Sequence, residues 1–198
     1  MGELERAVTP MGKRLLGQWV SKPLLDVSHI NQRQDGVTFF FTRGMLRAEL
    51  RAAMKPLNDL ERLAMRVAGG TAQPRDLLAM RQTLARLDGI ARLLQEEGLP
   101  IGNSPGQAAP GLEHILRDFD LCAVELALLD TAMADDPPAT LANTGIIRAG
   151  FSAELDGVLE RSRHARQWIA DLEGVERERT GIKTLKVGYN KVFGYYIE

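Results

Sequence analysis

The sequence predicts a mainly α-helical protein, a bundle of long helices with a short antiparallel β-hairpin at its C-terminal end. Apolar residues recur at steps of three and four through most of the chain, which is the period of an amphipathic helix. Prolines, glycines and capping residues divide these stretches where helices are expected to start and end. Aromatic residues are only 6% of the chain, while Leu, Ala and Arg are abundant, and this composition favours helices.

The first two helices have clear start signals. Thr9 followed by Pro10 predicts an N-cap with proline at the first helical position, and Pro23 is expected to lie beyond the end of that helix. Asp26 is placed to cap the next helix. The β-branched and aromatic run at residues 37–42 has the composition of a strand. Its neighbours are helical in pattern, so we predict that it continues the helix.

Three more helical stretches are expected in the middle of the chain. Residues 45–54 carry one apolar stripe, and Asp59 can cap a short helix that ends at the glycine pair 69–70. Residues 74–94 start with a proline and repeat apolar residues almost as a heptad. This repeat predicts a helix that packs against a partner helix.

The next third of the chain alternates loops and helices. Residues 98–111 are rich in proline and glycine and predict a loop. An apolar pattern predicts one helix over residues 112–129, followed by a connector over 140–150. Cys122, the single cysteine, lies within this pattern and is expected to be a buried, unreactive thiol. One cysteine allows no disulfide within the chain, which suits a reducing compartment.

The longest predicted helix follows this connector. One apolar face persists from residue 155 to 175, about 26 residues with the flanks, or roughly 40 Å of helix. Glu173 and Arg177 are spaced for an i,i+4 ion pair. Charge surrounds the C-terminal half of the helix, so we expect it to project from the body of the protein. Packing is expected of the apolar side chains Leu155, Val158, Trp168, Ile169 and Leu172.

The last nineteen residues predict two short antiparallel strands, 185–189 and 192–197, with a turn at 188–191. The sequence stops without a turn or cap, so we interpret the chain as a piece of a larger protein. Cations cluster here and alternate with tyrosines, a pattern that favours contact with the phosphate backbone of double-stranded DNA. The alternative is a solvated tip whose tyrosines pack on the hairpin face. The candidate DNA-backbone residues are Arg177, Arg179, Lys183, Lys186 and Lys191.

The sequence gives no support for catalysis by this chain. It contains neither a Walker A motif nor G-x-G-x-x-G, so no nucleotide cofactor is expected. His29, His114 and His164 fall on separate predicted helices and are expected to lie far apart, and no group has metal-ligand spacing. The chain has no apolar run long enough to span a membrane and no signal peptide, so a cytoplasmic location is expected.

Four stretches resemble the MutS family of DNA mismatch-repair proteins. They are residues 9–26, 59–77, 136–150 and 176–197. The last stretch is the most specific: it reads ERERTGI, then LKVGYN, then GYYI. The resemblance covers nearly the whole chain from about residue 9.

The resemblance implies a lever bundle. Residues 1–148 would be the first segment of the core or lever domain (domain III), and 149–198 the start of the clamp domain (domain IV). The parent would be a nucleoid-associated homodimer that binds mismatched double-stranded DNA, uses ATP and Mg²⁺ in an ABC-type ATPase domain and works with MutL. The mismatch-reading Phe-x-Glu and the ATPase motif are absent from this sequence. The alternative is a helical protein-interaction scaffold from a relative that does not recognise mismatches.

Overall fold

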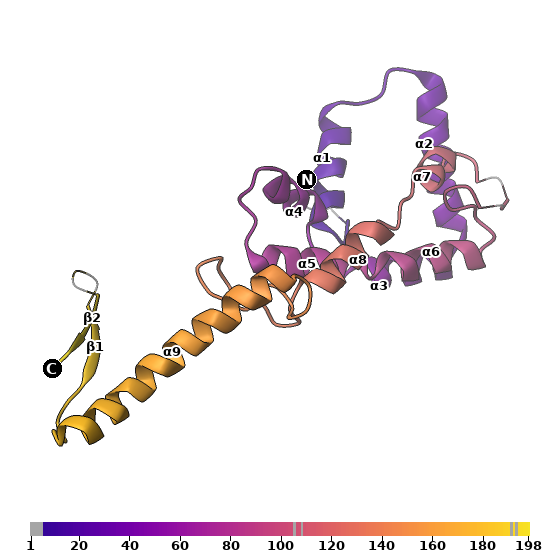
Figure 1. The fold of residues 1–198 in the computed structure, drawn as a ribbon. Helices are drawn as coiled ribbons and strands as arrows, with labels where there is room; N and C mark the ends of the chain where they lie inside the picture. Colours follow the sequence, from indigo (N-terminus) through magenta and orange to yellow (C-terminus); the bar gives the residue numbers. More distant parts are fainter. Residues whose placement is uncertain (1–5, 105, 108, 191, 193) are drawn as a thin grey trace. The chain divides into compact units, whose positions relative to one another are not determined.

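The computed structural model describes residues 6–104, 106–107, 109–190, 192 and 194–198. The chain divides into two compact units, Met1–Arg148 and Ala149–Glu198. The mainly helical fold with a C-terminal hairpin, predicted from the sequence, is confirmed (Figure 1). The helices of the first unit are α1 (Pro10–Ser21), α2 (Val27–Thr42), α3 (Gly44–Met54), α4 (Leu60–Ala68), α5 (Pro74–Leu84), α6 (Leu87–Glu96), α7 (Glu113–Arg117) and α8 (Ala123–Ala132).

Three helix starts follow the predicted capping chemistry. The Thr9 hydroxyl accepts a hydrogen bond from the backbone N–H of Gly12 at 3.1 Å, and proline follows it at the first helical position. The Asp26 carboxylate accepts from the N–H of His29 at 2.9 Å, and Asp59 caps α4 in the same way. The strand-like run at 37–42 lies within α2, as predicted.

The core of the first unit lies where α2, α3, α6 and α7 meet the loop between α6 and α7. The predicted loop is present, but three of its apolar residues, Leu99, Ile101 and Ala109, are buried in that core. The loop therefore has a packing role that its proline- and glycine-rich composition does not reveal. The buried cluster consists of Phe39, Leu46, Leu50, Ile90, Ala91, Leu94, Leu99, Ile101, Ala109, Leu112 and Leu116.

The helical stretch predicted over residues 74–94 is interrupted between α5 and α6. The cause is Thr83, whose buried hydroxyl donates to the carbonyl of Ala79, four residues back, at 2.8 Å. The same oxygen accepts from the backbone N–H of Asn58 at 3.1 Å. Bonding of a threonine hydroxyl to the i−4 carbonyl bends helices. The N–H of Arg86 then bonds to the carbonyl of Thr83, only three residues back, which tightens the last turn.

The prediction of a single helix over residues 112–129 is wrong. It is split into α7 and α8, and Cys122 lies at the junction in the left-handed conformation, with φ of 51°. The Asp120 carboxylate accepts from the N–H of Cys122 at 2.9 Å and so offers the backbone an alternative to the helix. The prediction of a buried thiol is also wrong, because Cys122 is half-buried. Partial burial and the nearby Asp120 carboxylate raise the pKa of its thiol.

The second unit contains α9 (Ala153–Thr180), β1 (Val187–Asn190) and β2 (Gly194–Ile197). The Ser152 hydroxyl caps the start of α9, and Gly181, with φ of 73°, ends it. β1 pairs antiparallel with β2, with Tyr189 opposite Tyr195. The predicted turn at 188–191 is wrong for its first three residues, which belong to β1. No helix among the described residues is both long enough and apolar enough to cross a membrane.

Candidate nucleic-acid interface

The candidate interface lies where α9 passes into the hairpin. Gly181 takes the left-handed conformation, and its N–H bonds to the carbonyl of Arg177 at 2.9 Å, so the helix stops there. Leu185 is the buried apolar residue of the connection between α9 and β1. Lys186 then pairs with Glu198 through both backbone groups, at 2.7 and 2.9 Å. These contacts place the cationic segment beside the base of the hairpin.

Arg177 has a structural role in this unit. Its Nε donates to the carbonyl of Leu185 at 2.8 Å, and its Nη2 lies 2.6 Å from the Glu173 carboxylate. The other Glu173 oxygen accepts from the N–H of Val187 at 3.2 Å. The predicted Glu173–Arg177 ion pair is therefore present, and it joins the helix to the connection and to β1. The positive charge of this guanidinium is thus partly neutralised by Glu173.

Arg179 is also paired, although it is exposed. Its Nη2 lies 2.7 Å from the Glu176 carboxylate, and its Nε donates to the same oxygen at 2.9 Å. The hydrogen bond and the negative charge of Glu176 raise the pKa of Arg179. The positive charge of Arg179 is thus partly neutralised by Glu176.

Lys183 and Lys186 differ from the two arginines. Both are exposed, and neither makes an ion pair with any residue that the structure describes. They lie three residues apart on the connection between α9 and β1. Lys191, the fifth candidate, lies outside the described residues. Two of the described candidates thus present their charge to solvent, and two are bound to glutamates.

The tyrosines lie on the hairpin. The rings of Tyr189 and Tyr195 have centroids 5.0 Å apart at an interplanar angle of 57°. Both remain more than half exposed. The Tyr196 ring lies over Gly188 so closely that a Cβ at Gly188 would be 2.6 Å from its Cζ. The tyrosines therefore pack on the hairpin, as the alternative interpretation expected, while two of them keep surface accessible to a partner.

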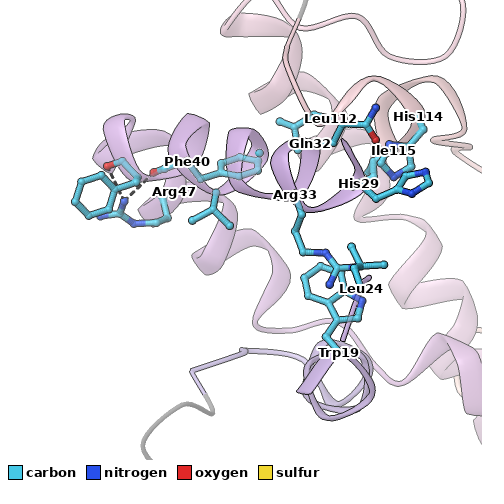
Figure 2. Close-up of a pocket in the computed structure, with 14 residues that line it drawn as sticks. Trp19, Leu24, His29, Gln32, Arg33, Phe40, Arg47, Leu112, His114 and Ile115 are labelled. Atoms are coloured by element: carbon cyan, nitrogen blue, oxygen red, sulfur yellow. Dashed lines mark hydrogen bonds between the residues drawn. The ribbon is translucent and has the colours of Figure 1, made fainter. Parts of the chain in front are cut away.

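The first unit holds a cavity that the sequence did not reveal. It has a volume of about 760 Å³ and is lined by residues of α1, α2, α3 and the segment 111–115. Figure 2 shows His29 and His114 on its wall, although we had expected these histidines to lie far apart. The Arg33 guanidinium lies 3.7 Å from the centroid of the Trp19 ring. The described residues contain no cluster of three or more His, Cys, Asp or Glu side chains suited to a metal.

Comparisons with known proteins match this fold to one family. The family model described as MutS domain III matches residues 1–187. A protein of Symbiobacterium thermophilum named DNA mismatch repair protein MutS is 43% identical over 98% of this chain and 21% of its own length. Proteins of the same name from Alkaliphilus oremlandii and Halalkalibacterium halodurans are 39% and 43% identical, with the same coverage. The chain thus spans about a fifth of the length of these relatives, and it belongs to the MutS domain III family of DNA mismatch-repair proteins.

Proposed function

We propose that this chain is part of a longer mismatch-repair clamp. In that protein it transmits conformational changes from the ATPase domain to the clamp and holds DNA, but it catalyses no reaction. Residues 1–148 are the first segment of the core or lever domain. Residues 149–198 are the start of the clamp domain, and their hairpin end contacts the phosphate backbone of double-stranded DNA. The family match and the names of the relatives support this proposal.

The observation that carries the DNA contact is the difference between the paired arginines and the exposed lysines. A lysine that makes no ion pair releases counterions from the phosphate backbone without first breaking a protein contact. We therefore assign backbone contact to Lys183 and Lys186. Lys191 is proposed as a third contact from its place in the sequence alone. Arg177 and Arg179 contribute by holding the end of α9 and the hairpin in position. Contacts of this kind fix the position of a duplex without reading its sequence.

The longer protein would supply everything else. We propose that it is a homodimer that binds mismatched DNA, hydrolyses ATP with Mg²⁺ in a separate ABC-type domain, acts with MutL and is associated with the nucleoid in the cytoplasm. The purified 198-residue chain is then expected to show no ATP hydrolysis. ATP turnover by the purified chain, retained through repeated purification, would overturn this assignment.

Salt dependence of DNA binding tests the proposed contact. In the longer protein, three backbone contacts from the clamp end contribute about −2.7 to the slope of log affinity against log salt concentration. Lys183→Gln or Lys186→Gln should each reduce the magnitude of this slope by about 0.9 for every clamp end that contacts the duplex, and should weaken binding equally for matched and mismatched duplexes. Arg179→Gln is the matched control, since its charge is already paired with Glu176. Fluorescence anisotropy with a labelled duplex at several salt concentrations gives the slopes.

The outcomes separate the two functions considered. Unchanged slopes in both lysine variants would show that Lys183 and Lys186 do not contact DNA and would refute their assignment. Affinity that is undetectable or independent of salt in the intact longer protein would favour a helical protein-interaction scaffold. A slope change with Arg179→Gln as large as with the lysine variants would refute the distinction between paired and exposed cations.

A further inference from the structure

The hairpin begins with residues whose backbone groups point alternately to its two sides. Lys186 and Glu198 exchange both backbone hydrogen bonds, at 2.7 and 2.9 Å, so the N–H and C=O of Lys186 face the opposite chain of the hairpin. Backbone groups alternate in direction along an extended chain. The C=O of Leu185 and the N–H of Val187 therefore face away from that chain. They lie on an edge where no strand among the described residues pairs with them.

Helix α9 supplies the partners for this edge, and β1 packs against the helix. The Nε of Arg177 donates to the C=O of Leu185 at 2.8 Å, and one oxygen of the Glu173 carboxylate accepts from the N–H of Val187 at 3.2 Å. The other oxygen of Glu173 lies 2.6 Å from Nη2 of Arg177. The two side chains are one helical turn apart, and together they offer one donor and one acceptor, as a neighbouring strand would. The α9–β1 junction consists of these four residues: Glu173, Arg177, Leu185 and Val187.

The junction encloses Lys186, which we assigned to the DNA backbone. The residues on both sides of this lysine, Leu185 and Val187, are each bonded to α9, and Leu185 is buried. Lys186 itself has both backbone groups bonded within the hairpin. The position of its side chain relative to α9 is therefore determined by the junction.

Glu173 is the member of the junction that bonds to both other parts. Its two oxygens face two different donors, the guanidinium of Arg177 and the N–H of Val187. An amide in place of the carboxylate has one acceptor oxygen, and its NH₂ group would face a donor. Glu173→Gln therefore breaks one of the two contacts, although the side chain keeps its size.

Glu176 offers a matched comparison one position before Arg177. Its carboxylate pairs with Arg179 of the same helix and bonds to no described residue of the hairpin. The two glutamates thus carry the same charge at neighbouring places on α9. They differ in that Glu173 alone of the two reaches β1.

We propose that Glu173 is a positioning residue for DNA binding, whose carboxylate holds β1 against α9 so that Lys186 can reach the phosphate backbone. The inference rests on the proposed function, because it requires the lysine contact. It adds a residue whose negative charge opposes DNA binding but whose geometry is needed for it. Charge and position therefore lead to opposite expectations for Glu173.

Glu173→Gln and Glu176→Gln in the longer protein test which of the two prevails. Charge alone would make both variants bind a duplex more tightly, since each loses one negative charge. We expect this of Glu176→Gln, which leaves Arg179 without its partner. Glu173→Gln should instead lower the affinity about five- to tenfold at about 0.1 M salt. It should also reduce the magnitude of the salt slope by about 0.9 for every clamp end that contacts the duplex, as Lys186→Gln does. Fluorescence anisotropy with a labelled duplex measures both quantities.

Amide hydrogen exchange measures the junction without DNA. In the 198-residue chain, the N–H of Val187 should exchange at least about tenfold faster in Glu173→Gln than in the original chain, because it loses a bond to a charged acceptor. In Glu176→Gln it should exchange at the original rate. Both variants should keep the far-UV circular dichroism of the original chain, since glutamine and glutamate have similar helix propensities. Equal exchange rates of Val187 in the two variants would refute the bond on which the inference rests.

DNA binding separates failure of this inference from failure of the proposed function. Equal affinities of the two glutamine variants would overturn the positioning role of Glu173, and so would a Glu173→Gln variant that binds at least as tightly as the original protein. If Lys186→Gln still lowers the slope, either result leaves the proposed DNA contact intact. An unchanged slope for Lys186→Gln would refute the contact itself, and the positioning role would be refuted with it.

Discussion

Replacing Gly111 with alanine probes the closest backbone contact of the first unit. Gly111 has φ of 79°, and it precedes the buried Leu112 at the end of the loop that enters the core. A Cβ at this position would be 1.9 Å from the carbonyl oxygen of Gln32 and 2.6 Å from the backbone nitrogen of Gly36. Both neighbours are backbone atoms of α2, so neither can rotate away as a side chain would. The substitution must therefore move the loop off the helix.

The expected cost has two parts. The left-handed conformation costs an alanine about 1–2 kcal/mol, and forcing extra volume into packed structure costs about 1–3 kcal/mol, so the total is about 2–5 kcal/mol. Gly70→Ala separates the two parts, since Gly70 has φ of 64° and open space around its Cβ position. Gly70→Ala should lower the free energy of unfolding by only about 1–2 kcal/mol. Gly17→Ala, in α1 with open space, should gain about 1 kcal/mol.

Urea unfolding followed by circular dichroism measures these differences in the free energy of unfolding. The slope of the transition with urea must be compared as well, because a changed slope would signal a change in the two-state behaviour. A Gly111→Ala loss no greater than that of Gly70→Ala would refute the close approach of the loop to α2. Stabilisation by Gly111→Ala would refute the assigned left-handed conformation too.

Two further predictions concern the segment that joins α3 to α5. Thr83→Val should lower the free energy of unfolding by about 1–3 kcal/mol, because it leaves the N–H of Asn58 without its partner. Thr83→Ser keeps the hydroxyl and should lose much less in urea unfolding. Equal losses in the two variants would contradict the role of this hydroxyl. The hydrogen bonds and charge of Arg14 lower the pKa of Asp59 from 3.8 to about 2. The ionised Asp59 side chain therefore contributes fully to the free energy of unfolding above about pH 4, and this contribution disappears as the pH falls through about 2. Asp59→Asn keeps a capping side chain but lacks this ionisation, so its unfolding free energy should fall less than that of the original chain between these pH values in acid titrations; equal acid sensitivity would refute the assignment.

Local signals in the sequence predicted most helix ends. Thr9, Asp26 and Asp59 each act within three residues of their own position, so a pattern read along the chain is sufficient to find them. The composition of residues 37–42 favours a strand, but they are helical, as predicted from their neighbours. In this helix Phe39 is buried in the core of the unit. Propensity yields to tertiary packing in such cases.

Several of the features that the sequence did not reveal originate in contacts between distant parts of the chain. The break after α5 depends on Thr83, whose hydroxyl accepts from Asn58, 25 residues away. The burial of the 98–111 loop depends on the approach of Gly111 to α2, nearly eighty residues earlier in the chain. His29 and His114 line one cavity for the same reason. Periodicity along the sequence carries no information about which segments meet, so these features required the structure.

At the candidate DNA interface, the charge pattern of the sequence did not distinguish the cations that pair with a carboxylate from those that do not. Charge alone made the cations at 177, 179, 183, 186 and 191 equivalent. The structure separates them by what lies one helical turn away. Glu173 and Glu176 precede Arg177 and Arg179 and pair with them, whereas the residues three and four positions before Lys183 are Thr180 and Arg179. Gly181 ends the stiff helix, and the connection that carries both exposed lysines begins there. A substitution such as Gly181→Ala would act on both properties together, and the resulting loss of DNA affinity would have to be compared with that of Lys183→Gln before either could be assigned to charge.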